Sequence, residues 1–292
     1  MTHKAGFVSI LGKPNVGKST LMNRILKENL SIVTPKAQTT RHRIKGILNT
    51  PEYQVVFSDT PGLLDPNYLL QSKMMDFVAA AVEDADVVLF ISDISEQYMD
   101  EKLVERIASF KVPVIIVINK IDISSTNEIN KLVHGWKKKV KPHAVIPVSA
   151  TQDFNIEEIL KTILELLPEA PAFFPKEDLS DATERFFVSE MIREKIFLHY
   201  EQEIPYASEV AIESFKEEDD IIRISAIIYV ERDSQKAILI GRKGEALKRV
   251  GTEARIDMEK FLNKKVFLEL FVKVEENWRK NENKLKRFGY SS

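Results

Sequence analysis

The chain has 292 residues, of which 44% are hydrophobic and 29% are charged, and it contains no cysteine. This length exceeds one ordinary compact core and suits two, and the composition is that of a folded chain rather than a disordered one. Disulfides, thiolate zinc sites and cysteine nucleophiles are excluded, and the histidines show no metal-ligand spacing such as HExxH. No apolar run is long enough to cross a membrane and the first residues lack a signal-peptide core, so we expect a cytoplasmic protein.

The formal net charge of -2 hides a local asymmetry. Residues 232–292 hold 16 basic and 9 acidic side chains. A near-neutral average therefore does not exclude a basic face that binds nucleic acid.

Residues 1–167 alternate short apolar runs with amphipathic stretches. The runs rich in Val and Ile predict strands that are buried on both faces, at 7–11, 55–57, 87–91, 114–118 and 144–148. Amphipathic stretches at 72–82, 100–110 and 156–167 predict helices. This alternation predicts an α/β fold, a doubly wound sheet with helices on both faces.

The segment 168–175 is rich in proline and cannot continue a helix, so we predict a linker at 168–182. Residues 183–292 predict a smaller α+β domain. Its expected elements are a helix at 183–200, strands near Val210 and at 221–230, a short helix, a glycine-bounded loop, a helix at 245–261 and a strand at 266–274. Apolar residues alternate from Ile222 to Val230, which predicts one buried face on that strand, and 217–220 predicts a hairpin turn.

A phosphate-binding motif follows the first predicted strand. Residues 12–19 match GxxxxGK[ST] and lead into a helix with Leu21, Ile25 and Leu26 on one face. In this setting backbone N–H groups close around phosphate oxygens, Lys18 reaches the outer phosphates and the Ser19 hydroxyl ligates Mg²⁺. The predicted nucleotide-binding residues here are Gly12, Lys13, Pro14, Asn15, Val16, Gly17, Lys18, Ser19 and Thr20.

A second motif, Asp59, Thr60, Pro61 and Gly62, follows the strand at 55–57. The Asp59 carboxylate can hold the metal through water, and the Gly62 N–H can sense the γ-phosphate. Alone this sequence is an ordinary turn, but behind a phosphate loop it predicts a switch element.

Base selection is predicted from Asn119, Lys120 and Asp122, which end the strand at 114–118. The Asp122 carboxylate can accept hydrogen bonds from guanine N1–H and the 2-amino group, neither of which adenine offers. We expect Lys120 over the ring and Asn119 bound to the phosphate loop. Ser149 and Ala150, after the next strand, would offer a backbone N–H to guanine O6. Four elements in this order at strand ends favour GTP over ATP.

A GxxG sequence joins two predicted helices of the second domain, which is the pattern of KH RNA-binding domains. Small glycines admit the sugar–phosphate backbone, and Arg242 and Lys243 contact phosphates. The alternative is a helix–turn–helix joint with solvated basic residues. The apolar residues before the loop and the face formed by Leu247, Val250 and Ile256 after it favour KH. The predicted RNA-binding residues are Ile240, Gly241, Arg242, Lys243 and Gly244.

Two other basic segments carry weaker signals. The tail contains Trp278, Arg279, Lys280, Lys284, Lys286 and Arg287. It forms an ordinary solvated helix face or else extends a phosphate footprint. The run 137–141 is interpreted as solvated surface, with a contact to the ribosome as the alternative.

These motifs resemble the translation-factor-related branch of Ras-like GTPases, and residues 38–42 resemble the first switch of the Era family. The resemblance to this family covers nearly the whole chain. The second domain resembles a type II KH domain. By this resemblance Thr40 completes the Mg²⁺ shell in the GTP state, and Asn15 and Thr39 match positions that help to place potassium in related members. The predicted metal ligands are then Ser19, Thr40 and Asp59, and the predicted catalytic residues are Lys18, Thr40 and Gly62. Leu63 stands where Ras-type enzymes carry a water-orienting glutamine, so slow intrinsic hydrolysis is expected.

The resemblance implies a monomeric GTPase that binds GTP and GDP, binds 16S ribosomal RNA near its 3′ end and assists maturation of the small (30S) subunit. Peripheral association with the inner membrane is a family option that no sequence feature displays. Two alternatives stay open. One is an RNA-binding protein that uses GTP only as a structural ligand, and the other is a P-loop small-molecule kinase, which residues 119–122 and the second domain disfavour.

Overall fold

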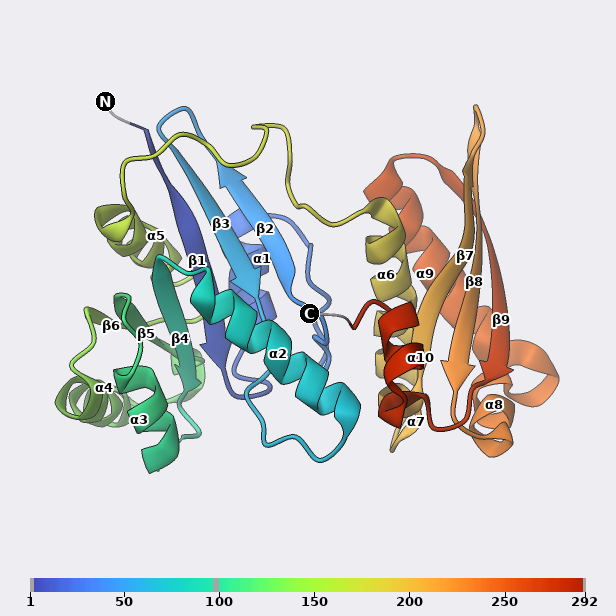
Figure 1. Ribbon diagram of the computed structural model, residues 1–292, viewed down its shortest axis with the longest axis horizontal. Coiled ribbons are helices and arrows are strands. Elements are labelled where there is room, and N and C mark those ends of the chain that lie inside the picture. The colour runs from blue at the N-terminus through green and yellow to red at the C-terminus, as the bar shows by residue number, and fades with distance from the viewer. Residues whose placement is uncertain (1–2, 97–99, 291–292) are drawn as a thin grey trace. The chain divides into compact units, whose positions relative to one another are not determined.

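The computed structural model describes residues 3–96 and 100–290, which form two compact units (Figure 1). The first unit comprises Met1–Ser31, Thr40–Asp65 and Met74–Asp181. The second comprises Ile32–Thr39, Pro66–Lys73 and Ala182–Ser292. The second unit therefore includes two short segments that lie, by sequence, within the predicted GTPase domain.

The first unit is built on a six-stranded sheet with the order β2-β3-β1-β4-β5-β6. Its strands are β1 (Lys4–Gly12), β2 (Ile44–Asn49), β3 (Tyr53–Asp59), β4 (Val87–Asp93), β5 (Val114–Asn119) and β6 (Ala144–Pro147). All neighbours pair in parallel except β2, which runs antiparallel to β3 at the edge. The five parallel strands match the predicted runs, whereas β2 was not predicted.

Helices cover both faces of this sheet, as the doubly wound fold requires. They are α1 (Lys18–Leu26), α2 (Leu69–Glu83), α3 (Glu101–Ala108), α4 (Thr126–Val140) and α5 (Ile156–Leu166), with a 3₁₀ turn at Ile121–Ile123. Of α2, the residues from Met74 onward belong to this unit. Val78 of α2, Ile107 of α3 and Trp136 of α4 share one core cluster with alternate residues of β4 and β5. Helix α1 contacts α5 and lies behind the sheet in the view in which α2 lies in front (Figure 1). The predicted fold class is confirmed, but α4 was missed.

The second unit has a three-stranded sheet with β8 in the centre. Its elements are α6 (Glu184–His199), α7 (Ile204–Ala207), β7 (Glu209–Glu217), β8 (Ile221–Val230), α8 (Asp233–Ile240), a 3₁₀ turn at Arg242–Gly244, α9 (Glu245–Leu262), β9 (Lys265–Val274), a 3₁₀ turn at Trp278–Lys280 and α10 (Glu282–Arg287). Strand β7 is antiparallel to β8 and joined to it by a tight turn, whereas β9 is parallel to β8. The parallel pair requires a crossover, which α8 and α9 supply.

One face of helix α9 closes the core of this unit. Val250, Ala254 and Met258 recur every four residues and are fully buried. The prediction that Ile256 lies on the same face as Val250 is wrong, since Ile256 is 41% exposed. Six residues rotate a helix by about 600°, which turns this side chain away from the core.

The C-terminal tail packs onto the second face of β8. Alternation predicted one buried face, but Ile227 and Tyr229 are buried as well. The ring of Tyr229 lies 5.0 Å from that of Phe288, centroid to centroid. Trp278 is fully buried, and its Nε1–H donates to the carbonyl oxygen of Ala207 at 2.9 Å. Trp278 therefore belongs to the core and is no candidate for an RNA contact.

Several basic side chains of the tail have internal partners. Lys286 pairs with Glu282 at 3.1 Å, Lys284 pairs with Glu275, and Arg287 donates to the Tyr229 hydroxyl at 2.7 Å. These contacts favour the ordinary structural interpretation of the tail over an extended phosphate footprint. Within residues 3–96 and 100–290, no helix combines the length and the apolar composition that a bilayer-spanning segment needs.

Candidate functional site

The phosphate loop connects β1 to α1 through two positions that require glycine. Gly17 has a φ of 96° and directly precedes α1. A Cβ atom on Gly17 would lie 2.2 Å from Nδ2 of Asn119, and one on Gly12 would lie 2.3 Å from the carbonyl oxygen of Ile91. The backbone of the loop thus approaches two neighbouring strands closely, and no side chain fits at either point.

Lys18 is buried at the first position of α1. Its ammonium donates to the carbonyl oxygens of Gly12 at 3.2 Å and Lys13 at 2.9 Å. Burial lowers the pKa of Lys18 to about 8, while the charge of Asp59 opposes the shift. The amine is thus held inside the loop, where a phosphate can replace its carbonyl partners.

The three predicted metal ligands lie together. The Ser19 hydroxyl donates to Oδ2 of Asp59 at 2.6 Å and lies 3.0 Å from the Thr40 hydroxyl. Burial raises the pKa of Asp59, against the opposing effects of its bond from Ser19 and the charge of Lys18. Oδ1 of Asp59 is buried and has no hydrogen-bond partner among the described residues.

This oxygen set fits a magnesium ion. Mg²⁺ prefers hard oxygen ligands and is usually held by one or two protein groups together with phosphates and water. A bound cation would also offset the cost of keeping the Asp59 carboxylate charged while buried. The described part of the chain contains no group of three or more His, Cys, Asp or Glu residues arranged to hold a metal, so the predicted ligands here are one carboxylate and two hydroxyls.

The predicted switch element lies against the phosphate loop. A Cβ atom on Gly62 would lie 2.7 Å from Cγ of Pro14, and the Leu63 N–H donates to the carbonyl oxygen of Gly12 at 3.0 Å. Thr60 is anchored by its hydroxyl, which donates to the carbonyl oxygen of Ile10 at 2.7 Å. Residues 60–63, including Pro61, are therefore placed beside the loop that would receive the outer phosphates.

Asn119 ties the predicted base loop to its neighbours. Its amide nitrogen donates to the carbonyl oxygen of Val16 at 2.9 Å, and its amide oxygen accepts the Ala150 N–H at 3.1 Å. The side chain of this one residue therefore fixes both the phosphate loop and the loop at 149–151.

Lys120 and Asp122 complete this region. The Lys120 ammonium donates to the carbonyl oxygen of Asn15 at 2.7 Å and to Oδ2 of Asp93 at 2.7 Å. Oδ1 of Asp122 accepts the Ser149 hydroxyl at 2.6 Å, which leaves its other oxygen for a base. The four sequence motifs thus meet at the carboxyl ends of the parallel strands, where doubly wound folds bind ligands.

Asp93 also belongs to this candidate site, through its bond from Lys120, although no sequence motif predicted it. Burial alone would raise the pKa of Asp93, but bonds from Lys120 and Ser95 lower it below its usual value. Asp93 ends β4 and stands opposite Asn119 in the strand register. A polar residue at the end of a buried strand was the available signal.

The two residues predicted to place potassium have different surroundings. Asn15 has a φ of 63° and gives its carbonyl oxygen to Lys120. Thr39 belongs to the second unit, and its hydroxyl donates to the carbonyl oxygen of Lys36 at 2.8 Å. Potassium binding stays a prediction.

The GxxG loop lies between α8 and α9 in the second unit. Gly241 has a φ of 72°, and a Cβ atom there would lie 2.6 Å from that of Ala246. Gly244 has a φ of 78°, but a Cβ atom there would meet nothing within 4 Å. Arg242 and Lys243 are exposed, and no ion pair is seen for either within residues 3–96 and 100–290. Gly244 therefore faces open space beside two available positive charges.

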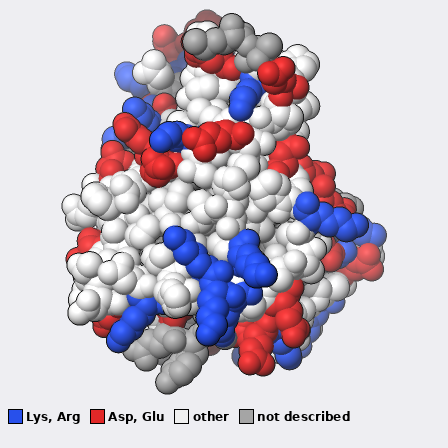
Figure 2. Space-filling model, turned by 90° about the vertical axis from the view of Figure 1, so that its left-hand side faces the viewer, with Lys and Arg blue, Asp and Glu red and all other residues white. Residues whose placement is uncertain are grey.

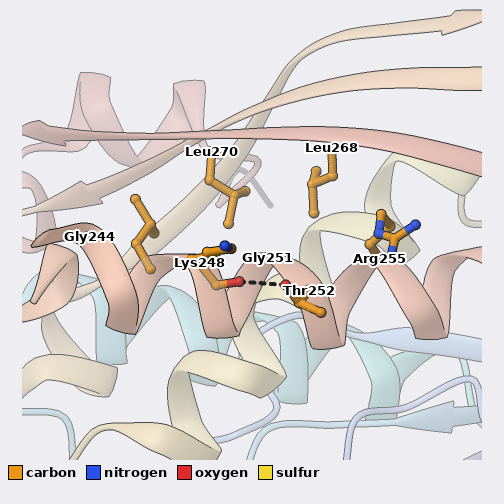
Figure 3. A pocket seen from close by; sticks show the side chains of 8 residues that line it. Gly244, Lys248, Gly251, Thr252, Arg255, Leu268 and Leu270 are labelled. Carbon is orange, nitrogen blue, oxygen red and sulfur yellow. Dashed lines mark hydrogen bonds between the residues drawn. The ribbon is translucent and has the colours of Figure 1, made fainter.

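A groove of about 340 Å³ begins at this loop (Figure 3). One wall is the surface of α9 and the other is formed by Leu268 and Leu270 of β9, whose side chains point toward the helix (Figure 3). At the narrow point a Cβ atom on Gly251 would lie 3.2 Å from Cδ1 of Leu270. The lining residues are Gly244, Leu247, Lys248, Gly251, Thr252, Arg255, Leu268 and Leu270.

The groove combines apolar side chains on its walls with basic side chains at its edge, a combination that suits a flat base attached to a phosphate chain. Arg255 is oriented by Glu259, whose carboxylate accepts its guanidinium N–H at 3.1 Å. Of the lining residues, only Gly244 was predicted to bind RNA.

The two units together define a class of protein, a P-loop GTPase joined to a KH domain. A family model described as a 50S ribosome-binding GTPase matches residues 7–120, and a KH domain model matches residues 203–279. GTPase Era of Geotalea daltonii is 45% identical over 98% of this chain and 97% of its own length. A chloroplastic GTPase ERA-like protein of Oryza sativa is 46% identical over 99% of this chain and 70% of its own.

A solved structure of Era in complex with MgGDPNP and nucleotides 1506–1542 of 16S ribosomal RNA superposes with a TM-score of 0.95 at 38% identity, covering 99% of this chain and 100% of that one. A variant of Era from Aquifex aeolicus bound to GDP·AlF4⁻ gives the same TM-score, identity and coverage. The chain belongs to the Era family of GTPases.

Proposed function

We propose that this GTPase binds the 3′ region of 16S ribosomal RNA in the groove of its KH domain and assists assembly and RNA maturation of the small (30S) ribosomal subunit. The observation that carries the proposal is the open Gly244 corner beside Arg242 and Lys243, which leads into an apolar groove. The solved Era complex with a 16S fragment supports the choice of RNA.

In the nucleotide site, Lys18 would compensate phosphate charge and the Gly62 N–H would meet the γ-phosphate. Ser19, Thr40 and Asp59 would hold Mg²⁺, which supplies positive charge for the phosphate oxygens when bound. Asp122 would accept from guanine while Ser149 holds its other oxygen. Leu63 offers no group that could orient the attacking water, so the water must be positioned by the backbone, a cation or a partner.

In the RNA site, the sugar–phosphate backbone of the RNA would cross the loop at Gly241 and Gly244, where no side chain obstructs it. Bases would enter between α9 and β9 and contact Leu268 and Leu270. Arg242 and Lys243 would contact phosphates, and Lys248 would extend this contact along the helix.

Two variants of the loop test this assignment. Gly244→Asp adds a carboxylate where a phosphate must approach, whereas Arg242→Ala with Lys243→Ala removes only favourable charge. The first should be the more damaging to binding of a 16S 3′-end RNA, and the second should flatten the log–log salt dependence by roughly 1.4 to 1.8, at about 0.7 to 0.9 per phosphate contact.

A matched control is Lys216→Ala with Lys273→Ala, which removes two charges of the same unit from strands β7 and β9. Nucleotide affinity and the unfolding midpoint would report intact folding in all three proteins. RNA affinity that is equal in the loop variants and the control would reject the groove as the RNA site.

We further propose that nucleotide state controls RNA binding. If GTP and RNA favour the same state of the protein, RNA affinity should be higher with a non-hydrolysable GTP analogue than with GDP, and RNA must tighten analogue binding by the same factor. A complete binding cycle measures both. Identical RNA affinity in the two nucleotide states would mean two independent modules.

Potassium as a second cation, a monomeric state, a cytoplasmic location and peripheral attachment to the inner membrane stay predictions. They rest on the family resemblance, and the first of them is given a kinetic test below.

A further inference from the structure

The end of helix α4 carries a dense positive charge that the nucleotide site does not use. Lys137, Lys138, Lys139 and Lys141 all lie within five residues, and all are exposed. We refer to these four residues as the α4 lysine cluster. Figure 2 views the side of the molecule on which α4 lies in Figure 1, and a group of Lys and Arg side chains is prominent in its lower half.

The cluster lacks neutralising partners in the part of the chain that the structure describes. Lysines elsewhere in the first unit do have such partners, for example Lys13 with Glu96 at 3.0 Å and Lys45 with Asp181 at 2.8 Å. None of the four cluster lysines has an ion pair with a carboxylate among residues 3–96 and 100–290. Four like charges within about one helical turn repel one another unless an anion lies close to them.

The helix that carries the cluster is firmly held. At its first turn Ser125 and Glu128 form a capping box, and near its end Trp136 is buried with its ring 5.5 Å from that of Phe90. After the helix, the His143 N–H donates to the carbonyl oxygen of Val114 at 2.8 Å. The lysines are therefore presented from a fixed scaffold, with only their own side chains free to adjust.

A purely structural role accounts for only part of this charge. A cation in the last turn of a helix interacts favourably with the helix dipole, and one or two lysines achieve most of that effect. Lys141 has a left-handed backbone conformation and lies beyond the final turn of α4. Additional lysines there mainly increase the mutual repulsion.

We propose that the α4 lysine cluster is a second RNA-binding surface, which contacts phosphates of structured ribosomal RNA while the KH groove holds a single-stranded segment. This inference rests on the proposed function, since it takes ribosomal RNA as the partner of the chain. The chemistry fits a phosphate backbone, because exposed flexible lysines contact phosphates without reading sequence.

RNA is favoured over an anionic membrane by the absence of an apolar anchor. Membrane-surface helices combine basic residues with large hydrophobic side chains that enter the lipid. Among the described residues, no large hydrophobic side chain of α4 is strongly exposed, and the nearest in sequence, Ile123, precedes the other end of the helix. A footprint of charge alone suits a folded RNA better.

Two RNAs and two variants test the proposal in the full-length chain. One RNA is a short single strand that fills only the KH groove, and the other is a long folded 16S fragment that contains the same strand. The cluster variant is Lys137→Gln, Lys138→Gln and Lys139→Gln. The control is Lys27→Gln, Lys102→Gln and Lys161→Gln, which removes three exposed but scattered charges of the same unit.

We expect the cluster variant to bind the short RNA as the wild type does and the long RNA roughly tenfold or more weakly near 0.15 M salt, with a log–log salt slope flatter by about 2. The control should stay within about twofold of the wild type on both RNAs. Tryptophan fluorescence, to which the buried Trp136 and Trp278 both contribute, and the unfolding midpoint check that the variants stay folded.

Equal affinity of the cluster and control variants for the long RNA would overturn the proposal. So would a selective loss of binding to vesicles of anionic lipid with unchanged RNA binding, which would assign the cluster to membranes. If the wild type failed to bind the short RNA but the cluster variant still lost the long RNA, the groove assignment would fail and the cluster assignment would stand.

Discussion

Replacing Asp122 by asparagine should move nucleotide preference from GTP toward xanthosine triphosphate, and the structure indicates the direction in which the new amide will point. The Ser149 hydroxyl donates to Oδ1 of Asp122 at 2.6 Å. In Asp122→Asn this bond keeps the amide oxygen on the Ser149 side, because an NH2 group cannot accept it. The NH2 group then faces the base, opposite the 2-amino group of guanine but the 2-oxo group of xanthine.

The magnitude follows from the bond that is lost. A hydrogen bond to a charged group contributes about 1.5 to 3 kcal/mol, so GTP should bind roughly 10- to 150-fold more weakly. Xanthosine triphosphate gains a donor where it previously met a carboxylate. If the gain for xanthosine triphosphate is of similar size, the preference ratio should change by roughly 100- to 20,000-fold.

Competition against a fluorescent guanine nucleotide measures this ratio. The double variant Asp122→Asn, Ser149→Ala is the informative control, because the amide can then flip and present its oxygen to guanine. Its preference should lie between those of the wild type and the single variant. Unchanged guanine preference in Asp122→Asn would refute the assignment of Asp122 to the base.

Three further predictions concern Lys18, a second cation and the tail. Burial lowers the pKa of Lys18 to about 8 before phosphate binds, so affinity for a GTP analogue should fall by up to about tenfold per pH unit above pH 8. The variant Lys18→Met should bind the analogue weakly and show no such pH dependence. Calorimetry from pH 7 to 9 measures both affinities, and a flat wild-type profile would contradict the prediction. Basal GTP hydrolysis should be slow, and it should be faster in potassium than in sodium at matched ionic strength, because a cation near the β–γ bridge supplies positive charge that the side chain of Leu63 cannot. Equal rates in the two salts would reject a catalytic role for potassium. The variant Trp278→Ala should lower the free energy of unfolding of the second unit by about 3 to 5 kcal/mol, because it empties a fully buried site and leaves the Ala207 carbonyl oxygen without its donor. Denaturant titration measures this free energy. A change below about 1 kcal/mol would show that the tail is not part of the core.

The sequence predicted the fold best in segments whose residue types have a single structural explanation. Strands buried on both faces appear as unbroken Val and Ile runs, and the phosphate and base motifs follow them directly. Strand β2 was missed because it is an antiparallel edge strand that contains Lys45 and Gly46. Helix α4 was missed because its lysines suggested surface rather than a helix end.

Tertiary partners could not be predicted in the same way. The groove wall depends on Leu268 and Leu270 of β9 meeting Gly251 of α9, and neither segment shows that contact by its own pattern. Trp278 lies among basic residues, and only its packing on β8 identifies it as a core residue. Local motifs therefore singled out the loops to which we assign phosphate binding, whereas the surfaces beside these loops could be recognised only in the folded chain.

The parallel pairing of β9 with β8 imposes an order on the synthesis of this protein. Every residue that we predict to bind nucleotide precedes residue 152, whereas one wall of the proposed RNA groove is β9, Lys265–Val274. Strand β9 can pair with β8 only after both crossover helices have left the ribosome, since parallel neighbours need their complete connection. A nascent chain can therefore form a GTP pocket while it still has no groove for RNA. Newly made protein would not compete for ribosomal RNA until its translation is nearly finished.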